Sequence, residues 1–379
     1  MNRKEALEHF ENTIAKSKVD EILVQFYEDF KNQKEEFCKK LFHGVRTLLE
    51  QMNETEKEVE LAVIHINYLQ AHIIDGTYQW RIAAYDQTEY LDKTEREIYV
   101  AFPEIFQCLQ KLEDELQKEV RKYVGNLNEG DIIPYKLQAF EKCLGCIYLA
   151  ATYTFHQLRQ EEFYKIRKKF NIFRILLGGY MEQMQLVFLQ TNEDYEKAKE
   201  EWYLPGEKKT LDEQKFVYRD YSQIEMREVS KRVEAKNLMF TCFAQSQIYY
   251  HIFTFCSMIG VNFSESQIES SAFVAATMQQ ADFTKATISN CDMHTSMFYG
   301  GEYVDGEVTP GIFPVSFRNA TLDRVNFMFC DLRNCDFEGA VMKEIVFDGA
   351  KLSGARINSC YRDQLDFTKE QMQEIIWIE

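Results

Sequence analysis

The sequence predicts a two-part chain, with a bundle of long α-helices up to about residue 260 and a regular repeat from residue 261 onward. Three observations carry this prediction. Only 5 prolines and 16 glycines occur in 379 residues, which favours long uninterrupted helices. Apolar residues recur with a helical period in the first part and with a period of five in the second. With 45% hydrophobic residues, the chain can bury a substantial core.

The helical part is predicted from two long apolar stripes with steps of three, four or seven residues. The first stripe contains Ile22, Phe26, Phe30, Phe37, Leu41, Val45 and Leu48, and the second contains Leu137, Phe140, Leu144, Ile147, Ala151, Phe155 and Leu158. Breakers such as Gly76 and Gly178-Gly179 fall between periodic segments. We therefore expect six to eight helices over residues 1–260, with the last helix over about residues 225–256 covering the start of the repeat.

The second part repeats a large apolar residue at every fifth position, with an interruption after Phe298. The large residues are Phe263, Ile268, Phe273, Met278, Phe283, Ile288, Met293 and Phe298, and then Phe317, Leu322, Phe327, Leu332, Phe337, Met342, Phe347, Leu352 and Ile357. A small or slim residue stands two positions before each of them, as in Ala281-Asp282-Phe283 and Cys330-Asp331-Leu332. Seventeen matches to one template indicate a genuine repeat.

This pattern resembles the pentapeptide-repeat family. The resemblance implies a right-handed quadrilateral β-helix over residues 261–367, with four pentapeptides in each square coil and about four coils in all. The large residue and the small one before it would point inward, and the other three would face solvent. The expected fold class is therefore α+β, an N-terminal all-α bundle followed by this solenoid.

The implied geometry can be tested within the sequence, because residues twenty apart should stack on one face. The faces keep their character across the interruption only if Phe317 directly follows Phe298 in the repeat count. The register therefore predicts a 14-residue insertion at one corner, within residues 301–314. Asp305-Gly306 suits a two-residue hairpin turn there. The insertion is either a tolerated surface loop or a contact finger, whose candidate residues are Tyr303, Asp305, Glu307 and Phe313.

An apolar stripe on the solenoid is the second candidate contact. Val274, Met328, Phe329 and Val346 occupy outward positions where polar residues are expected. Either the helical part folds over this stripe or another chain does. At the C-terminus, Thr368 and Gln371 fit a capping box that opens a short capping helix within residues 368–379.

Composition excludes several classes of function. The 61 acidic and 44 basic residues give a net charge of −17, which argues against direct nucleic-acid binding. The charged N-terminal residues lack an apolar signal segment, and the apolar stretch 238–259 contains Gln245 and His251, too polar for a membrane span. Ten cysteines in a large chain without a signal are expected to be reduced. We therefore expect a cytoplasmic protein with no membrane contact.

No residue pattern indicates catalysis. The chain lacks nucleotide-binding glycine motifs and the nucleophile elbow of hydrolases. His65, His72 and Asp75 could share a helix face, and Cys143 and Cys146 form a CxxC pair inside an apolar run. We interpret these residues as ordinary helix packing, the alternative being a metal or redox site. The prediction is therefore no enzyme, with no catalytic, cofactor-binding or metal residues and no cofactor.

The function predicted from these features is a non-enzymatic scaffold or adaptor. The β-helix would be a rigid platform for an unidentified protein partner or for a homodimer contact. One alternative, implied by the resemblance, is mimicry of B-form DNA to modulate DNA gyrase. From residue 261 onward, 18 acids are interrupted by 9 bases, which disfavours a continuous phosphate mimic. A second alternative is an effector or defence component whose activity lies in the helical part. The usual distribution of the family suggests a bacterial source.

Overall fold

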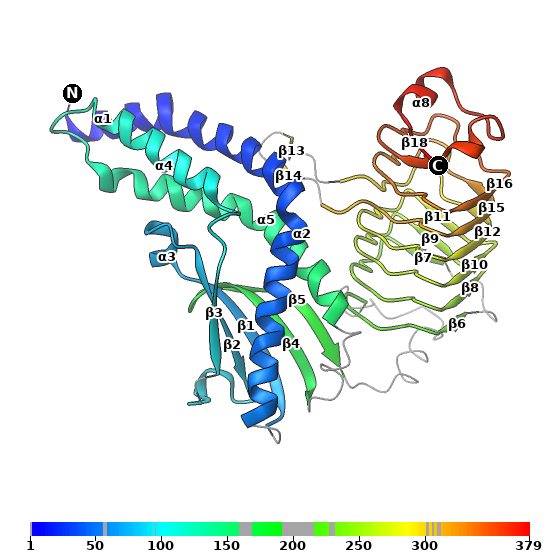
Figure 1. Ribbon diagram of the computed structural model, residues 1–379, viewed down its shortest axis with the longest axis horizontal. Coiled ribbons are helices and arrows are strands. Elements are labelled where there is room, and N and C mark those ends of the chain that lie inside the picture. Colours follow the sequence, from blue (N-terminus) through cyan, green and yellow to red (C-terminus); the bar gives the residue numbers. More distant parts are fainter. Residues whose placement is uncertain are drawn as a thin grey trace. The chain divides into compact units, whose positions relative to one another are not determined.

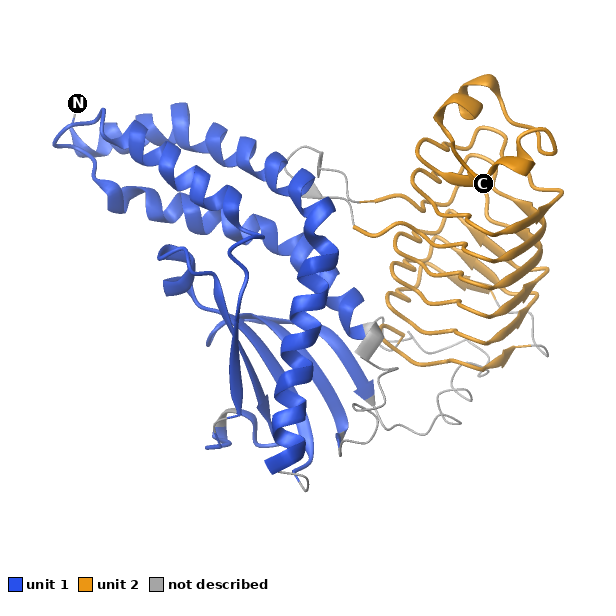
Figure 2. Ribbon diagram, viewed as in Figure 1, with its two compact units in different colours: residues 1–191, 303–308 blue, residues 192–302, 309–379 orange. Residues whose placement is uncertain are grey.

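The structure is a computed structural model, in which the chain folds as two compact units (Figures 1 and 2). One unit comprises residues 1–191 and 303–308, and the other comprises residues 192–302 and 309–379. The structure describes residues 2–55, 59–94, 96–158, 169–191, 216–226, 232–300, 303–304, 307–308 and 312–379.

In its described residues, the first unit contains three longer helices and a five-stranded sheet (Figure 1). The helices α2 (Lys16–Thr55), α4 (Gln107–Val120) and α5 (Ile133–Leu158) follow the short α1 (Arg3–Phe10), and α3 (Gln70–Ile74) follows the first strand. Six of the seven residues of the first predicted stripe are no more than 2% exposed, and Ile22 is 3% exposed. The prediction of a long helix there is confirmed by α2, which has 40 residues.

The sheet has the strand order β3-β2-β1-β4-β5. Its strands are β1 (Leu61–Tyr68), β2 (Gln79–Tyr85), β3 (Glu97–Ala101), β4 (Lys169–Gly179) and β5 (Met184–Thr191). One face packs on the helices, where Trp80 contacts Phe37 with ring centroids 6.1 Å apart and Tyr68 contacts Phe140 at 5.0 Å. Gly44 of α2 allows this close approach, because a Cβ there would lie 2.8 Å from a methyl carbon of Val100.

The prediction that residues 1–260 form an all-α bundle is wrong. Gly178-Gly179, predicted to be a break between helices, end strand β4, and Gly76 lies in the turn between α3 and β2. The run Leu61-Ala62-Val63-Ile64-His65-Ile66 is rich in β-branched residues, which favour strands. All eight residues of β1 are buried, so the strand lacks the alternation of apolar and polar residues that marks a half-buried strand.

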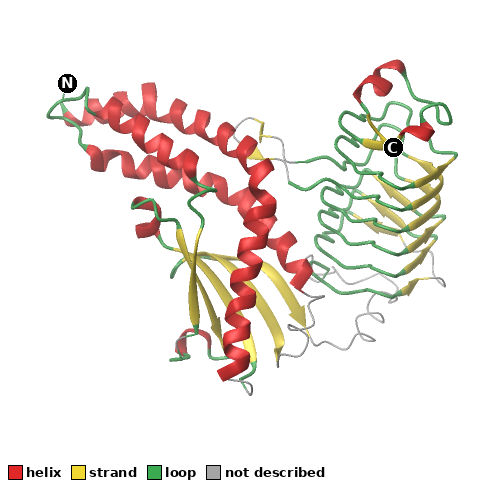
Figure 3. Ribbon diagram, viewed as in Figure 1, coloured by secondary structure: helices red, strands yellow, loops and turns green. Residues whose placement is uncertain are grey.

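The second unit is a parallel β-coil whose short strands stack with the chain turning at corners between them (Figure 3). Its strands are β6 (Glu225–Met226), β7 (Arg232–Glu234), β8 (Gln247–Tyr249), β9 (Ile252–Thr254), β10 (Gln267–Glu269), β11 (Ala272–Val274), β12 (Thr287–Asp292), β15 (Thr321–Asn326), β16 (Val341–Lys343), β17 (Arg356–Asn358) and β18 (Ile376–Ile378). Pairing joins residues twenty apart, as in Gln267 with Thr287, so the predicted stacking of every fourth repeat is confirmed.

The register survives the insertion as predicted. Asp282 bridges to Ser316 and Thr287 pairs with Thr321, each 34 residues apart, which is one coil of twenty plus fourteen inserted residues. The insertion carries a small hairpin, β13 (Tyr303–Val304) with β14 (Glu307–Val308), in which Val304 pairs with Glu307. The Asp305-Gly306 turn itself lies outside the described residues.

The coil begins earlier than predicted. One column of bridges runs through Asp220, Cys242, Asn262, Asp282, Ser316, Asp336 and Arg356. The expected helix over residues 225–256, the boundary near residue 260 and the estimate of about four coils are therefore wrong. The large residues Leu238, Phe243, Ile248, Phe253 and Met258 already follow the period of five and are buried.

Polar residues, two of them larger than the polar residues of the later repeats, occupy the small position of these early repeats. Thr241, Ser246 and His251 stand two residues before Phe243, Ile248 and Phe253. Their side chains are buried and bond to backbone carbonyls: Thr241 Oγ1 donates to Phe216 O at 2.5 Å, and Ser246 Oγ donates to Tyr221 O at 3.0 Å. Polar side chains are thus accommodated inside the coil because each finds a backbone partner.

The C-terminal end of the coil is covered by a short helix and a strand. Thr368 and Gln371 form the predicted capping box at the start of α8 (Lys369–Glu374). The helix is shorter than predicted, because Ile376–Ile378 form β18 and pair with β17. The Gln371 Nε2 group donates to the carbonyls of Phe347 and Ala350, both at 2.9 Å, so the cap satisfies backbone groups of the last coil.

Candidate functional site

The four apolar residues singled out in the sequence lie on one face of the coil. Phe253, Phe273, Met293, Phe327 and Phe347 are the inward residues of this face in five successive coils. The surface called the Phe329 face below consists of the outward residues next to them: the one before and the two after each inward residue. Its members are Ile252, Thr254, Phe255, Ala272, Val274, Ala275, Asp292, His294, Thr295, Asn326, Met328, Phe329, Val346, Asp348 and Gly349.

Two phenylalanines dominate the exposed apolar surface of this face. Phe329 is 64% exposed and Phe255 is 63% exposed, whereas Val274, Met328 and Val346 are half-buried. Both phenylalanines occupy the same corner of the coil, separated by the smaller Ala275 and Thr295. The predicted repeat starts at residue 261, so the sequence pattern does not single out Phe255.

The position of the Phe329 ring is set by its neighbour in the next coil. The backbone of Phe329 is left-handed, with φ of 57°, and its N–H donates to Asp348 O at 2.9 Å. The ring lies against Gly349, where an added Cβ would lie 2.4 Å from a ring carbon. Gly349 itself has φ of 66°, so two independent constraints select glycine there. One side of the Phe329 ring therefore packs against the backbone of Gly349, and its other side faces solvent.

A small polar cluster lies in the middle of the face. Asn326 Nδ2 donates to Asp292 Oδ1 at 2.9 Å, and His294 Nδ1 lies 2.9 Å from the same oxygen. The side chains of Asp292 and His294 are 43% and 38% exposed. The Phe329 face has two aspartates and one histidine but no lysine or arginine at its fifteen positions. Its charged groups are therefore predominantly acidic, in contrast to the faces beside it.

The neighbouring faces pair their acids with bases. Arg318 and Arg356 flank Asp336 and Glu338, with Arg318 Nη1 2.8 Å from Asp336 Oδ2 and Arg356 Nη2 2.9 Å from Glu338 Oε2. Arg333 lies 2.7 Å from Asp331 in the same way. The excess of acids on the coil is thus broken up by ion pairs outside the Phe329 face.

The insertion does not join the Phe329 face in the described residues. It leaves the coil after Phe298, one corner further along the chain. Ile312 N–H donates to Gln280 Oε1 at 2.6 Å, and Phe313 is half-buried. Tyr303 and Glu307 belong to the hairpin backbone, and their side chains and Asp305 lie outside the described residues. The finger residues therefore remain predictions.

The histidines considered as a possible site are not brought together. His65 lies on β1, His72 lies in α3, where its Nδ1 contacts Gln79 O at 2.8 Å, and Asp75 ends α3 and accepts from Thr77. Cys143 and Cys146 are buried in α5, and burial raises the pKa of Cys146 to about 12. All ten cysteines are free. The interpretation of this CxxC pair as core packing fits these surroundings.

A charged cluster that the sequence analysis missed lies on the sheet face opposite the helices. His65 is fully buried, and its Nε2 lies 3.0 Å from Glu89 Oε1. The other carboxylate oxygen of Glu89 accepts from Arg174 at 3.0 Å. Burial lowers the pKa of His65, although the bond to Glu89 acts in the opposite direction. A histidine between β-branched residues on a buried strand was the available signal for this cluster.

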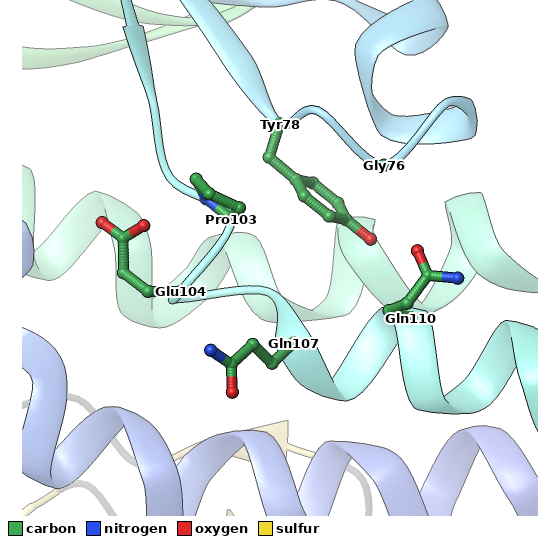
Figure 4. A pocket seen from close by; sticks show the side chains of 6 residues that line it. All are labelled: Gly76, Tyr78, Pro103, Glu104, Gln107 and Gln110. Carbon is green, nitrogen blue, oxygen red and sulfur yellow. The ribbon is translucent and has the colours of Figure 1, made fainter.

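A shallow cavity of about 330 Å³ opens between α4 and the turn before β2 (Figure 4). Gly76, Tyr78, Pro103, Glu104, Gln107 and Gln110 line it. Tyr78 is 2% exposed, has a left-handed backbone with φ of 46°, and stacks on Phe106 with centroids 5.2 Å apart. Its hydroxyl group makes no hydrogen bond with any described residue. The Glu104 carboxylate on the cavity wall pairs with Lys40.

Membrane insertion by a helix finds no support in the described part of the chain, because none of its helices combines the length and the apolar character needed to cross a bilayer. Among the described residues, no group of three or more histidine, cysteine or acidic side chains is placed to hold a metal ion.

Comparison with solved structures finds pentapeptide-repeat proteins. A trypsin-treated form of QnrB1, a plasmid-mediated fluoroquinolone resistance protein, is 18% identical, with 38% of this chain and 73% of QnrB1 covered and a TM-score of 0.22. HetL, a protein involved in heterocyst differentiation regulation in the cyanobacterium Nostoc sp. strain PCC 7120, is 15% identical, with 37% and 62% covered and a TM-score of 0.15. Rfr23 from the cyanobacterium Cyanothece 51142 is also 15% identical, with 36% and 90% covered and a TM-score of 0.15.

No curated protein matches this chain closely enough to indicate a relationship. The family profile of pentapeptide repeats matches residues 315–339 and 326–361, in eight copies. The matched residues lie in the coil whose rungs join residues twenty apart, which is the spacing of four five-residue repeats. The C-terminal coil of this chain is therefore a pentapeptide-repeat structure.

Proposed function

We propose that this protein is a non-enzymatic interaction platform, in which the pentapeptide-repeat coil holds the Phe329 face rigidly for contact with another protein. The observation that supports this proposal most strongly is the exposure of Phe329. A phenylalanine that is 64% exposed contributes little to the stability of its own coil. Exposed apolar patches on an otherwise polar surface are typical of contact sites.

The local structure favours binding because the face is already ordered. Rungs of parallel pairing fix its backbone, and Gly349 fixes the ring of Phe329. A partner would therefore not have to order a loop on binding, and the entropic cost of association is lower for such a surface. Rigid aromatic side chains are also enriched among the residues that dominate binding energy at protein interfaces.

Mimicry of DNA is less well supported than a protein contact of this kind. A phosphate mimic requires a continuous row of unneutralised acids, whereas Arg318, Arg333 and Arg356 each form ion pairs with acids on the coil. We place the protein in the cytoplasm as part of the same proposal, since its ten free cysteines suit a reducing compartment.

The proposal is tested by affinity purification of the tagged full chain from its native host. Phe329→Glu introduces a charge on the Phe329 face. Tyr250→Glu is the matched control, because Tyr250 is an aromatic residue, 57% exposed, at a different corner with a similar left-handed backbone, φ 59°. We expect a partner protein in near-equal amount with the wild-type chain and Tyr250→Glu, and its loss with Phe329→Glu. Equal recovery with all three proteins would show that this face is not the contact.

A further inference from the structure

The partner of the Phe329 face can be described by its chemistry. We infer that this face binds a short segment of another protein that carries one bulky apolar residue flanked by lysine or arginine. The inference rests on the proposed function, since it names what the contact surface would recognise. It is drawn from the charge, the spacing and the size of the face.

Acidic groups stand on both sides of Phe329. Asp348 lies in the coil that follows it, where its carbonyl accepts the N–H of Phe329 at 2.9 Å. Asp292 lies in the coil that precedes it, since Asp292 pairs with Asn326 across one rung. Asp348 is thus close to Phe329, one coil further along the axis, whereas Asp292 lies one coil back at the other end of the strand, in the column of Asn326.

Neither carboxylate has a lysine or arginine partner within the described structure. Asp348 is exposed and forms no ion pair with any described residue, and Asp292 bonds only to Asn326 and His294 among the described side chains. Elsewhere on the coil, acids such as Asp331 and Asp336 are matched by arginines. Asp348 is therefore available to a cation from outside, whereas Asp292 is already bonded to Asn326 and His294.

The size of the face favours a segment over a folded domain. From Phe255 to Phe329 is three coil steps, or about 14 Å, and the three outward residues of one strand span about 10 Å. A stable dimer usually buries about 800 Å² on each partner, several times the area of such a strip. An extended segment advances about 3.3 Å per residue, so basic side chains within two positions of the apolar residue would reach Asp292 and Asp348.

The net charge of the whole chain also favours a basic segment. With a net charge of −17, the chain attracts basic segments at long range and repels acidic ones. Close charge pairs would then fix the register of the segment, while the apolar side chain packs on the Phe329 ring and on Met328.

The test uses random twelve-residue peptides displayed on phage and selected on the immobilised full-length chain, with Phe329→Glu for counter-selection. The expected result is an enriched set in which a large apolar residue has lysine or arginine within two positions. Asp348→Lys should then weaken binding of a synthetic peptide from that set at least tenfold in fluorescence anisotropy. Replacing the peptide lysine by glutamate should restore binding to this variant. Glu344→Lys is the matched control, because Glu344 is exposed at another corner, and it should leave binding unchanged.

Three outcomes would overturn the inference. Selected peptides that need Phe329 but lack basic residues would contradict the prediction of a basic segment, although the Phe329 face would still be a contact surface. Failure to enrich any peptide over the Phe329→Glu control would contradict binding of a short segment. A light-scattering mass of two chains that falls to one with Phe329→Glu would identify a second copy of this chain as the occupant instead.

Discussion

Phe283 and Phe317 are 34 residues apart in the sequence, yet their rings stack in adjacent coils with centroids 4.9 Å apart and planes 5° from parallel. The same column continues to Phe263 at 5.1 Å and to Phe337 at 4.8 Å. The insertion between Phe298 and Phe317 therefore leaves the inward-facing column unbroken. This continuity keeps Met328 and Phe329, which follow the insertion, on the same face as Val274, which precedes it.

Removal of the insertion tests this register. Deletion of residues 301–314 should leave Phe317 five positions after Phe298 and change the free energy of unfolding of the coil by no more than about 1 kcal/mol, because loop length affects stability weakly. Deletion of residues 302–314 is the matched control, since it leaves six positions and shifts inward residues outward. We expect that control to lose about 3 kcal/mol or more. Equal losses in urea unfolding followed by circular dichroism would refute the register.

Gly349→Ala should destabilise the coil by about 1–2 kcal/mol, because Gly349 has φ of 66° and the added Cβ would meet the Phe329 ring. The steric part of the loss should disappear when Phe329→Ala is present, whereas the backbone part should remain. Urea unfolding of the two single variants and the double variant measures this coupling. Strict additivity of the two changes would mean that the ring does not rest on Gly349.

Tyr78→Phe should stabilise the N-terminal unit by about 1 kcal/mol, because it removes a buried hydroxyl group that has no partner among the described residues. The ring, which stacks on Phe106, is retained. Tyr99→Phe is the control, since that hydroxyl lies on an exposed side chain and bonds Glu97 at 3.1 Å. Thermal unfolding compares them, and a clear loss of stability in Tyr78→Phe would show that the hydroxyl group has a partner.

The N-terminal unit should lose stability as the pH falls below about 6.5, the ordinary pKa of histidine. Burial lowers the pKa of His65 in the folded state, so the unfolded chain binds more protons than the folded chain in this pH range. Acidification therefore lowers the free energy of unfolding. His65→Gln should flatten this dependence in urea unfolding at neutral and mildly acidic pH. The exposed His43→Gln controls for removal of a histidine. An unchanged pH dependence in His65→Gln would rule out His65 as its source.

The parts of the fold that could be predicted are those whose apolar residues recur with a period that fits only one type of structure. The stripe from Ile22 to Leu48 fits only a helix, and the five-residue repeat determined the stacking from Phe263 onward together with the length of the insertion. The central sheet could not be recognised in the same way. The residues of β1 are buried on both faces, and a short apolar run of this kind has no distinguishing period.

The early coils were missed for a related reason. His251 and Thr241 are large or polar for the inward small position, and they are tolerated because each side chain finds a backbone carbonyl. The sequence does not show that these side chains would find backbone partners. Phe255, the second exposed phenylalanine of the Phe329 face, lies in these early coils and was therefore not predicted. Phe329 was predicted because it interrupts an otherwise regular pattern of polar outward residues.

The central claim is that the Phe329 face touches another protein, and site-specific photo-crosslinking tests it most directly. A benzophenone-bearing phenylalanine analogue replaces Phe329 in the full chain within the native host, and Tyr250 in the control. The account predicts a discrete adduct with a different protein from position 329 and none from position 250. Absence of an adduct at 329, or the same adducts from both positions, would contradict it.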